Sequence, residues 1–245
     1  MKRNICICIL VLSFIFKTGS VFASEYYVNP NGVVFNAQQF NYISDMYYVG
    51  YQDTMTQSEF DKIVELDLFK QPIIIVEQNG MNSKSNYVVM GNSSTQYGVT
   101  TTITKSCTTQ CLVTLKATWS VIPSIKSFDV IGFRLANASI DTINKATISG
   151  NNYSVTYQPS DAKASSNGFG YSIKLSNSVG MKITTSMYTS GSGTVFGSYQ
   201  HANYNVTLAT SKLYNISPSG YGNVFSFYGN AMFKYNNAVG VDVTL

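Results

Sequence analysis

Few side chains in this sequence could do acid–base chemistry, and they are scattered. The chain has a single histidine, His201, and only 12 acidic residues. A catalytic histidine needs a nucleophile and an orienting carboxylate brought from elsewhere in the fold, and the sequence contains no nucleophile-elbow motif. Asp129 begins an apolar strand pattern on the same side as Ile131 and Phe133, which predicts an acid at the rim of a sheet. We therefore expect a structural or surface role for His201, with catalysis as the alternative.

The closest group of acids falls on a predicted helix and consists of Glu59, Asp61, Glu65 and Asp67. Acids near the start of a helix are explained by the helix dipole and by solvation. A glycosidase needs two carboxylates that face each other across a cleft. A single helix face does not predict that pairing, so we assign no catalytic residue.

Cys107 and Cys111 are separated by three residues and can form a disulfide only across a turn. In an extended strand their α-carbons would lie about 13 Å apart, beyond the limit of roughly 7 Å for a disulfide. Strand-like sequences on both sides predict a three-residue hairpin loop that brings the two sulfurs together. Two free thiols are the alternative. A metal site is not expected, because no histidine or further cysteine lies nearby.

No cofactor or metal site is predicted elsewhere. Gly191, Gly193 and Gly197 do not precede a predicted helix whose amino terminus could bind a phosphate, so we expect them to be hairpin glycines. Asp45 and Asp53 lack the alternating oxygen ligands of a calcium loop.

The first 23 residues have the parts of a secretory signal peptide. Lys2 and Arg3 precede an apolar run over residues 5–16, and small residues precede a cut after Ala23. Cleavage also removes Lys17, so 16 basic side chains become 13 against 12 acidic ones. The near-neutral remainder has no basic cluster for phosphates and no second apolar stretch of membrane-spanning length. The sequence predicts a secreted protein, of bacterial composition, without a nucleic-acid partner or a stable membrane anchor.

The next part of the chain has a helical pattern. Asn36 with Gln39, and Thr56 with Glu59, each fit a capping box at a helix start. Gly50 is the expected stop between the two helices. The apolar positions at helical spacing are Phe40, Ile43, Met46 and Tyr47, followed by Phe60, Ile63 and Val64.

From Pro72 onward the apolar period changes to two. In residues 113–121, and again in 169–175 and 239–245, apolar side chains alternate with polar ones or glycine. Further candidate strands are 73–76, 87–90, 128–135, 153–157, 181–187, 195–208 and 224–233. Turn-forming clusters such as Ser190 to Gly193 separate these runs.

Many short strands with one polar face and no helices between them predict a mainly β protein, an antiparallel β-sandwich of the jelly-roll or immunoglobulin-like type. The expected organisation is a signal peptide over 1–23, an extended and helical segment over 24–68 docked on the β region, and a sandwich domain over 69–245.

Tyrosine is abundant, at 18 residues, while charged residues make up 11% of the chain. Rigid amphipathic rings give contact area at low entropic cost, so this composition is typical of binding surfaces. Tyr47, Tyr48 and Tyr51 are the most concentrated group, and we expect them to bind a partner. On a helix Tyr48 turns about 100° away from the other two. The alternative is a wide apolar stripe that buries two of them and leaves one exposed.

Three classes of function fit these observations. The favoured one is a secreted, non-enzymatic binding or surface-interaction protein with an extracellular protein or glycan partner. The Ser- and Thr-rich runs 100–109 and 184–194 resemble the amphipathic hairpins of aerolysin-like toxins, which implies a β-type pore-forming or membrane-active toxin as an alternative. An extracellular hydrolase is the second alternative. A cleft with two or more convergent polar groups would reopen the enzymatic interpretation.

Overall fold

The structure, a computed structural model, describes residues 26–48, 50–79, 98–151, 153–202, 204–205, 213–217, 224–228 and 239–245. The expected signal peptide and the candidate strand 87–90 lie outside the described residues. In chain order the elements are β1 (Tyr27–Val28), β2 (Val34–Phe35), α1 (Ala37–Met46), η1 (Tyr51–Thr54), α2 (Gln57–Glu65), η2 (Leu68–Lys70), β3 (Ile74–Asn79), β4 (Val99–Cys107), β5 (Cys111–Trp119), β6 (Phe128–Gly150), β7 (Tyr153–Tyr157), η3 (Pro159–Asp161), β8 (Lys163–Ser165), β9 (Gly168–Lys174), β10 (Lys182–Gln200), β11 (Tyr214–Ile216), β12 (Phe225–Phe227) and β13 (Val239–Thr244).

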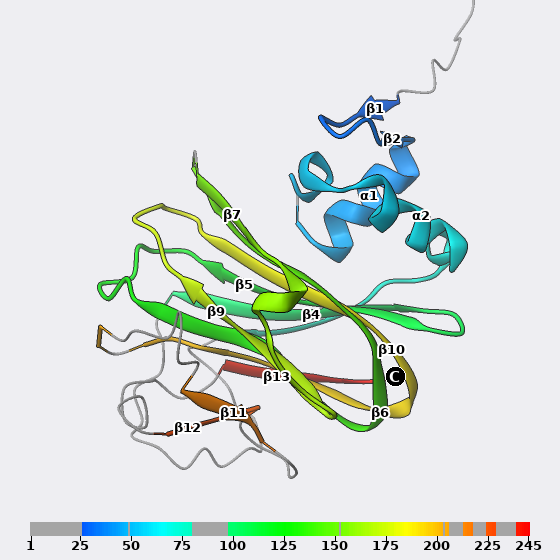
Figure 1. The fold of residues 1–245 in the computed structure, drawn as a ribbon. Coiled ribbons are helices and arrows are strands. Elements are labelled where there is room, and N and C mark those ends of the chain that lie inside the picture. Colours follow the sequence, from blue (N-terminus) through cyan, green and yellow to red (C-terminus); the bar gives the residue numbers. More distant parts are fainter. Residues whose placement is uncertain are drawn as a thin grey trace, which may run out of the picture.

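Two long antiparallel strands, β6 and β10, join the two layers of an antiparallel β-sandwich (Figure 1). Residues 182–189 of β10 pair with β5, which continues the first layer through β4 to β3, and the end of β6 pairs with β7. Residues 194–199 of β10 pair with β13, and the start of β6 pairs with β9, which pairs with β8 in the second layer. The predicted mainly β sandwich is confirmed.

The bend between the layers lies where the sequence predicts a turn. The ladder between β6 and β10 shifts register after Gly191, which has φ 114°, opposite Asn137, which has φ 58°. Gly193 passes so close to the Ala136 carbonyl that a Cβ would not fit. The expected hairpin at Ser190 to Gly193 is therefore wrong, because a glycine bulge lets one strand bend and continue.

The alternation of apolar and polar residues is confirmed in the core between the layers. Val113, Leu115, Ala117 and Trp119 of β5 face the inward side chains of β9, β10 and β13 in one buried cluster. The outer face of the second layer is covered by the β11–β12 hairpin, where the Tyr214 hydroxyl donates to the Gly170 carbonyl oxygen at 2.7 Å.

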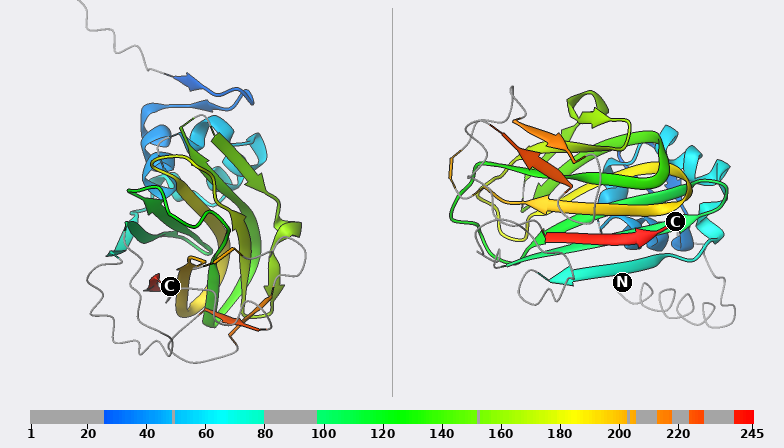
Figure 2. Two further views of the ribbon diagram at one scale, coloured as in Figure 1. Left: turned by 90° about the vertical axis from the view of Figure 1, so that its left-hand side faces the viewer. Right: turned by 90° about the horizontal axis from the view of Figure 1, so that it is seen from below.

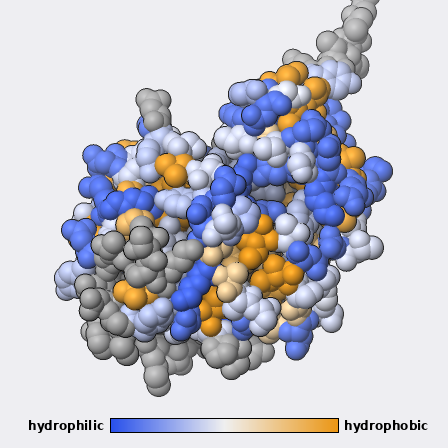
Figure 3. All heavy atoms as spheres, in the orientation of Figure 1, coloured by the Kyte–Doolittle hydropathy of each residue, from blue (hydrophilic) through white to orange (hydrophobic). Residues whose placement is uncertain are grey.

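The helical segment covers the outer face of the first layer, on the opposite side of the molecule from β11–β12 (Figure 2). Both predicted capping boxes are present, at Asn36 and at Thr56. Helix α1 ends at Met46, before the expected stop at Gly50, and Val64 is exposed rather than buried. Hydrophilic residues gather over this segment, at the upper right of the surface in Figure 3.

The helical segment is fixed to the sheet by hydrogen bonds as well as by apolar contacts. Thr104 Oγ1 donates to the Met46 carbonyl oxygen at 2.9 Å, and Lys116 Nζ donates to the Asp45 carbonyl oxygen at 2.8 Å. Leu112 and Tyr188 from the sheet share a buried cluster with the helices. The first layer is therefore covered on both faces, which explains why Thr and Ser residues on its outer face are buried.

Candidate functional site

The three tyrosines expected to form a binding surface lie where the helical segment meets the sheet. Tyr47 and Tyr51 are buried, at 3% and 2% exposure, and their rings stack at a centroid distance of 3.9 Å. Tyr48 is half-buried, and its hydroxyl lies 3.3 Å from Thr147 Oγ1. The expectation of exposed rings is wrong for Tyr47 and Tyr51, because the segment buries two of the three against the sheet. Burial also raises the pKa of both hydroxyls well above the usual value.

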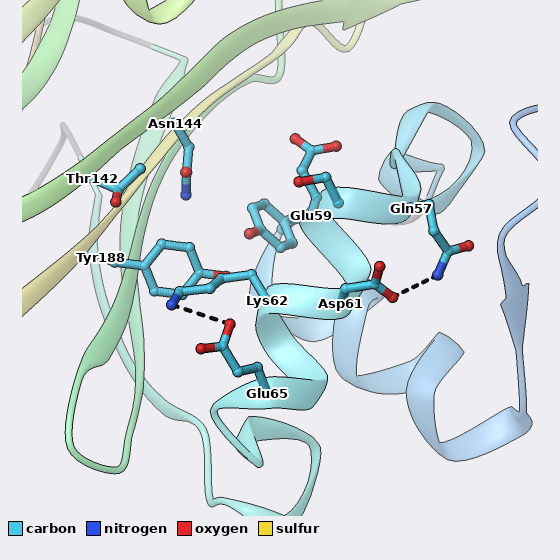
Figure 4. Close-up of a pocket in the computed structure, with 10 residues that line it drawn as sticks. Gln57, Glu59, Asp61, Lys62, Glu65, Thr142, Asn144 and Tyr188 are labelled. Carbon is cyan, nitrogen blue, oxygen red and sulfur yellow. Dashed lines mark hydrogen bonds and ion pairs between the residues drawn. The ribbon is translucent and has the colours of Figure 1, made fainter.

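An open cleft of about 530 Å³ lies between helix α2 and strands β6 and β10 (Figure 4). It is lined by Tyr47, Gln57, Ser58, Glu59, Asp61, Lys62, Glu65, Thr142, Asn144 and Tyr188. The acids that the sequence places on a solvated helix face therefore form one wall of a cleft. The opposite wall was not predicted, because the strand predicted over residues 128–135 was ended too early, although Ala136, Ala138 and Ile140 continue its alternation with polar residues.

Glu59 fixes the helix wall to the sheet. Its carboxylate accepts a hydrogen bond from the Thr56 backbone nitrogen at 2.8 Å and pairs with Lys145 Nζ at 2.9 Å. Lys145 also donates to the Thr54 carbonyl oxygen at 3.1 Å. The Lys145 side chain is only 11% exposed, so solvent screens this ion pair weakly.

The other charged groups of the helix wall are more open to solvent. Asp61 accepts a hydrogen bond from the Gln57 amide at 2.7 Å, and Lys62 Nζ lies 3.4 Å from a Glu65 carboxylate oxygen. Lys62 and Glu65 lie three positions apart on α2 and are neighbours on its surface, whereas Asp61 precedes Lys62 directly and points toward Gln57 (Figure 4). These groups are free to exchange their partners for a ligand.

The strand wall is neutral and rigid. Asn144 Nδ2 donates to Ser186 Oγ at 3.0 Å, and the Asn144 carbonyl oxygen accepts from the Tyr171 hydroxyl at 2.7 Å. Tyr188 is almost fully buried, and Lys62 Nζ lies 6.0 Å from the centre of its ring. Burial raises the pKa of the Tyr188 hydroxyl above its usual value, which already keeps the group protonated at neutral pH.

This arrangement suits hydrogen bonding better than hydrolysis. All carboxylates that line the cleft come from α2, whereas the facing wall supplies an amide, a hydroxyl and a phenol. A pair of catalytic carboxylates would need one on each side of the substrate. The cleft contains the convergent polar groups of a binding site without that pairing.

A second polar cluster lies inside the sandwich, where β6 begins and β10 ends. His201 Nδ1 lies 2.9 and 3.0 Å from the two oxygens of Asp129, and the Ala202 backbone nitrogen donates to the same carboxylate at 3.1 Å. The Tyr199 hydroxyl donates to Asp129 and accepts from Trp119 Nε1 at 2.8 Å. Burial raises the pKa of Asp129, and the hydrogen bond from His201 opposes the rise.

Asp129 lies at the start of β6, as the sequence predicts for a strand-end acid, but it is fully buried, because Tyr199 of β10 and the residues after that strand close over it. The structural role expected for His201 agrees with its burial in this cluster. The alternation in the sequence places Asp129 on the same inward side as Ile131 and Phe133, so its burial could have been predicted. The strand that supplies its partners, β10, could not be identified from the sequence.

Comparisons with models of known protein families and with curated proteins found no match. Among solved structures, the chain is similar to the collagen-binding domain of the Erysipelothrix rhusiopathiae surface protein RspB, with 7% identity, a TM-score of 0.29, and coverage of 59% of this chain and 64% of that one. It is also similar to the collagen-binding domain of a Staphylococcus aureus adhesin, with 10% identity, a TM-score of 0.30, and coverage of 56% and 89%. At these TM-scores the likenesses carry no argument about this chain.

The predicted disulfide between Cys107 and Cys111 is present at the tip of the β4–β5 hairpin. The three-residue loop between them contacts the helical segment, since Thr108 Oγ1 donates to the Leu66 carbonyl oxygen at 2.9 Å. The bridge therefore lies beside the helix pair rather than at a free end.

The two Ser- and Thr-rich runs lie in the sheet. Residues 100–107 belong to β4, and 184–194 belong to β10, which pairs with strands on both sides. No helix among the described residues is long and apolar enough to span a membrane. Within the same residues, no three metal-binding side chains of the His, Cys, Asp and Glu types come together.

Proposed function

We propose that the protein is a secreted binding protein that holds an extracellular protein or glycan partner in the cleft between α2 and strands β6 and β10. The observation that carries this proposal is the pairing of a charged, solvent-accessible helix wall with a neutral wall fixed on two central strands. A rigid wall keeps its polar groups in place without a loss of entropy on binding.

The two alternatives have less support in the structure. A glycoside hydrolase would need carboxylates on both sides of its substrate, and a nucleophilic hydrolase would need a base such as histidine beside its nucleophile; the residues that line this cleft include neither arrangement. A pore former would need a segment that can leave the sheet, whereas residues 184–189 pair with both β5 and β6.

The test is binding of the chain without residues 1–23 to glycan arrays, cell-wall preparations and immobilised extracellular proteins. Asn144→Ala removes a polar group of the neutral wall and is expected to weaken binding roughly fivefold, the equivalent of one hydrogen bond. Thr156→Ala is the control, because Thr156 is an exposed residue of β7 outside the cleft.

If neither Asn144→Ala nor Thr156→Ala changes the affinity, the ligand does not bind in the cleft. Release of dye from liposomes by the same protein would favour the pore former instead.

A further inference from the structure

The strands at the borders of the two layers differ in how they are protected from pairing with another chain. The first layer has β3 and β7 at its borders, and the second layer has β13 and β8. The outer side of a border strand presents backbone N–H and C=O groups at the spacing with which another strand pairs. Proteins protect such an edge by shortness, charge, proline or a bulge, so an edge without these features indicates a site of strand pairing.

Three of the border strands have little apolar surface to offer a partner. Strand β8 is three residues long, and the exposed residues of β7 are Ser154 and Thr156. In β13 the apolar side chains of Val241 and Val243 are buried in the core between the layers. Pairing at these edges would therefore bury little apolar surface.

Strand β3 is the exception. Its first three residues, Ile74, Ile75 and Val76, are 47%, 56% and 36% exposed. Residues 74–79 contain no lysine, arginine or proline, and their ladder with β4 has no register shift, so none of the usual devices protects this edge. In the right-hand view of Figure 2, β3 is the cyan strand at the lower border of the sheet.

The exposed side chains of β3 lie on both faces of the sheet. Ile75 is paired with Thr104, which faces the helical segment, whereas Val76 is paired with Ile103 of the core. Directly paired residues share a face of the sheet, so the edge is open on both faces. A neighbouring strand covers both faces at once, because its side chains alternate between them.

The same strand of a second copy has the matching pattern. Two β3 strands related by a two-fold axis are antiparallel, as β3 already is to β4. In the register centred on Ile75, this residue lies opposite its own counterpart, and Ile74 lies opposite Val76 of the other copy. Each of these pairs joins two β-branched side chains, which pack well in strands. Glu77, the one charged residue of β3, lies opposite Ile73 in this register, so no like charges meet.

We propose that the protein associates through β3 into a two-fold dimer in which the first layers of two copies form one continuous sheet. The 13 basic and 12 acidic side chains after residue 23 leave the two copies without strong repulsion. A contact based on one six-residue strand from each copy is smaller than the roughly 1,200 Å² of a stable interface, so the dimer is reversible. Strands β4 and β5 separate β3 from β10, so this pairing does not use the strands of the cleft.

Sedimentation velocity of the chain without residues 1–23, at concentrations from about 5 to about 500 µM, tests the proposal. We expect a shift from monomer to dimer across this range. Ile75→Lys places a charge at the centre of the paired edge and is expected to raise the dissociation constant by roughly tenfold or more. Ile122→Lys is the matched control and should leave it unchanged, because Ile122 is 42% exposed and lies between β5 and β6. Circular dichroism checks that both variants are folded.

A cysteine in place of Ile75 tests the register. In the register centred on this residue the two α-carbons lie about 5 Å apart, within the range for a disulfide. Mild oxidation of Ile75→Cys should therefore give a covalent dimer that a reductant separates on a denaturing gel. Ile122→Cys should form such a dimer much more slowly under the same conditions.

Three results would overturn the proposal. A monomer at every concentration would show that a second copy does not cover the edge. If Ile75→Lys then weakened binding to an immobilised extracellular protein, the edge would belong to a strand of that protein instead. Equal effects of Ile75→Lys and Ile122→Lys on dimerisation would indicate non-specific association of exposed apolar residues. Equal cross-linking of Ile75→Cys and Ile122→Cys would exclude the two-fold pairing centred on Ile75.

Discussion

Acidic and basic side chains meet in two regions of this molecule, with opposite consequences. Inside the sandwich, Asp129 and His201 are 0% and 5% exposed, and the carboxylate receives donors from His201, Tyr199 and the Ala202 backbone. In the cleft, Lys62 and Glu65 form an ion pair that is open to solvent. The same residue types serve the stability of the fold in one place and are left available to a ligand in the other.

Burial makes this difference. A charge inside the protein is tolerated only when hydrogen bonds replace the water it has lost, and removing one partner leaves the rest uncompensated. A charge at an open cleft keeps its water until a ligand displaces it. We therefore expect mutations in the interior cluster to affect folding, and mutations in the cleft to affect binding.

Asp129→Ala has the largest expected effect. It leaves His201, the Tyr199 hydroxyl and the Ala202 backbone nitrogen without their acceptor, and breaking a buried pair in this way costs about 3–5 kcal/mol of unfolding free energy. Urea unfolding followed by the fluorescence of Trp119, the only tryptophan, measures this loss.

Asp61→Ala is the comparison, with an expected change within about 0.5 kcal/mol, because it removes an acid of the cleft wall. Equal losses for the two variants would show that the distinction between the two regions is wrong.

Replacing both cysteines, as Cys107→Ser with Cys111→Ser, is the next largest change. The loop that the bridge closes is short, so the chain-entropy estimate of its contribution is about 2 kcal/mol. Hydrogen exchange should show faster opening of residues 57–65, because the same hairpin contacts the helical segment through Thr108. Faster exchange confined to β9, in the second layer, would contradict this expectation.

Lys145→Gln tests the contact between the cleft wall and the sheet. It removes a largely buried ion pair with Glu59 and a hydrogen bond to the Thr54 carbonyl oxygen, with an expected loss of about 1–2 kcal/mol. Ligand affinity should fall as well, since α2 loses its tie to β6.

Lys163→Gln is a suitable control, because Lys163 lies on β8 in the second layer. If Lys145→Gln destabilises the protein no more than this control, the ion pair contributes little to holding the cleft.

The sequence was informative wherever the determinants are local. Both capping boxes need only residues three apart, and the alternation in β5 needs only one strand, so these features could be predicted. The disulfide follows from the same reasoning, because a hairpin is a local structure.

Features that depend on distant pairing could not be predicted. The continuation of β6 beyond Ile140 to Gly150, and of β10 through Gly191, is stabilised by the ladder between these two strands. That ladder also brings Asn144 and Tyr188 together to form the neutral wall of the cleft. In the same way, Asp129 and His201 are 72 residues apart and meet only when both strands are in place.

Tyr48→Phe has the smallest expected effect and tests the aromatic surface that the sequence suggested. Tyr48 does not line the cleft, and among the described residues its half-buried hydroxyl makes one hydrogen bond, to Thr147 Oγ1 at 3.3 Å. Losing that bond should cost about 0.5 kcal/mol of unfolding free energy and leave affinity for a cleft ligand unchanged within about twofold. Tyr48→Ala also removes the ring that packs against Tyr51, so it should cost more stability but still leave binding at the cleft in place. Loss of binding by Tyr48→Ala in a protein that remains folded would move the binding surface from the cleft to the tyrosine group.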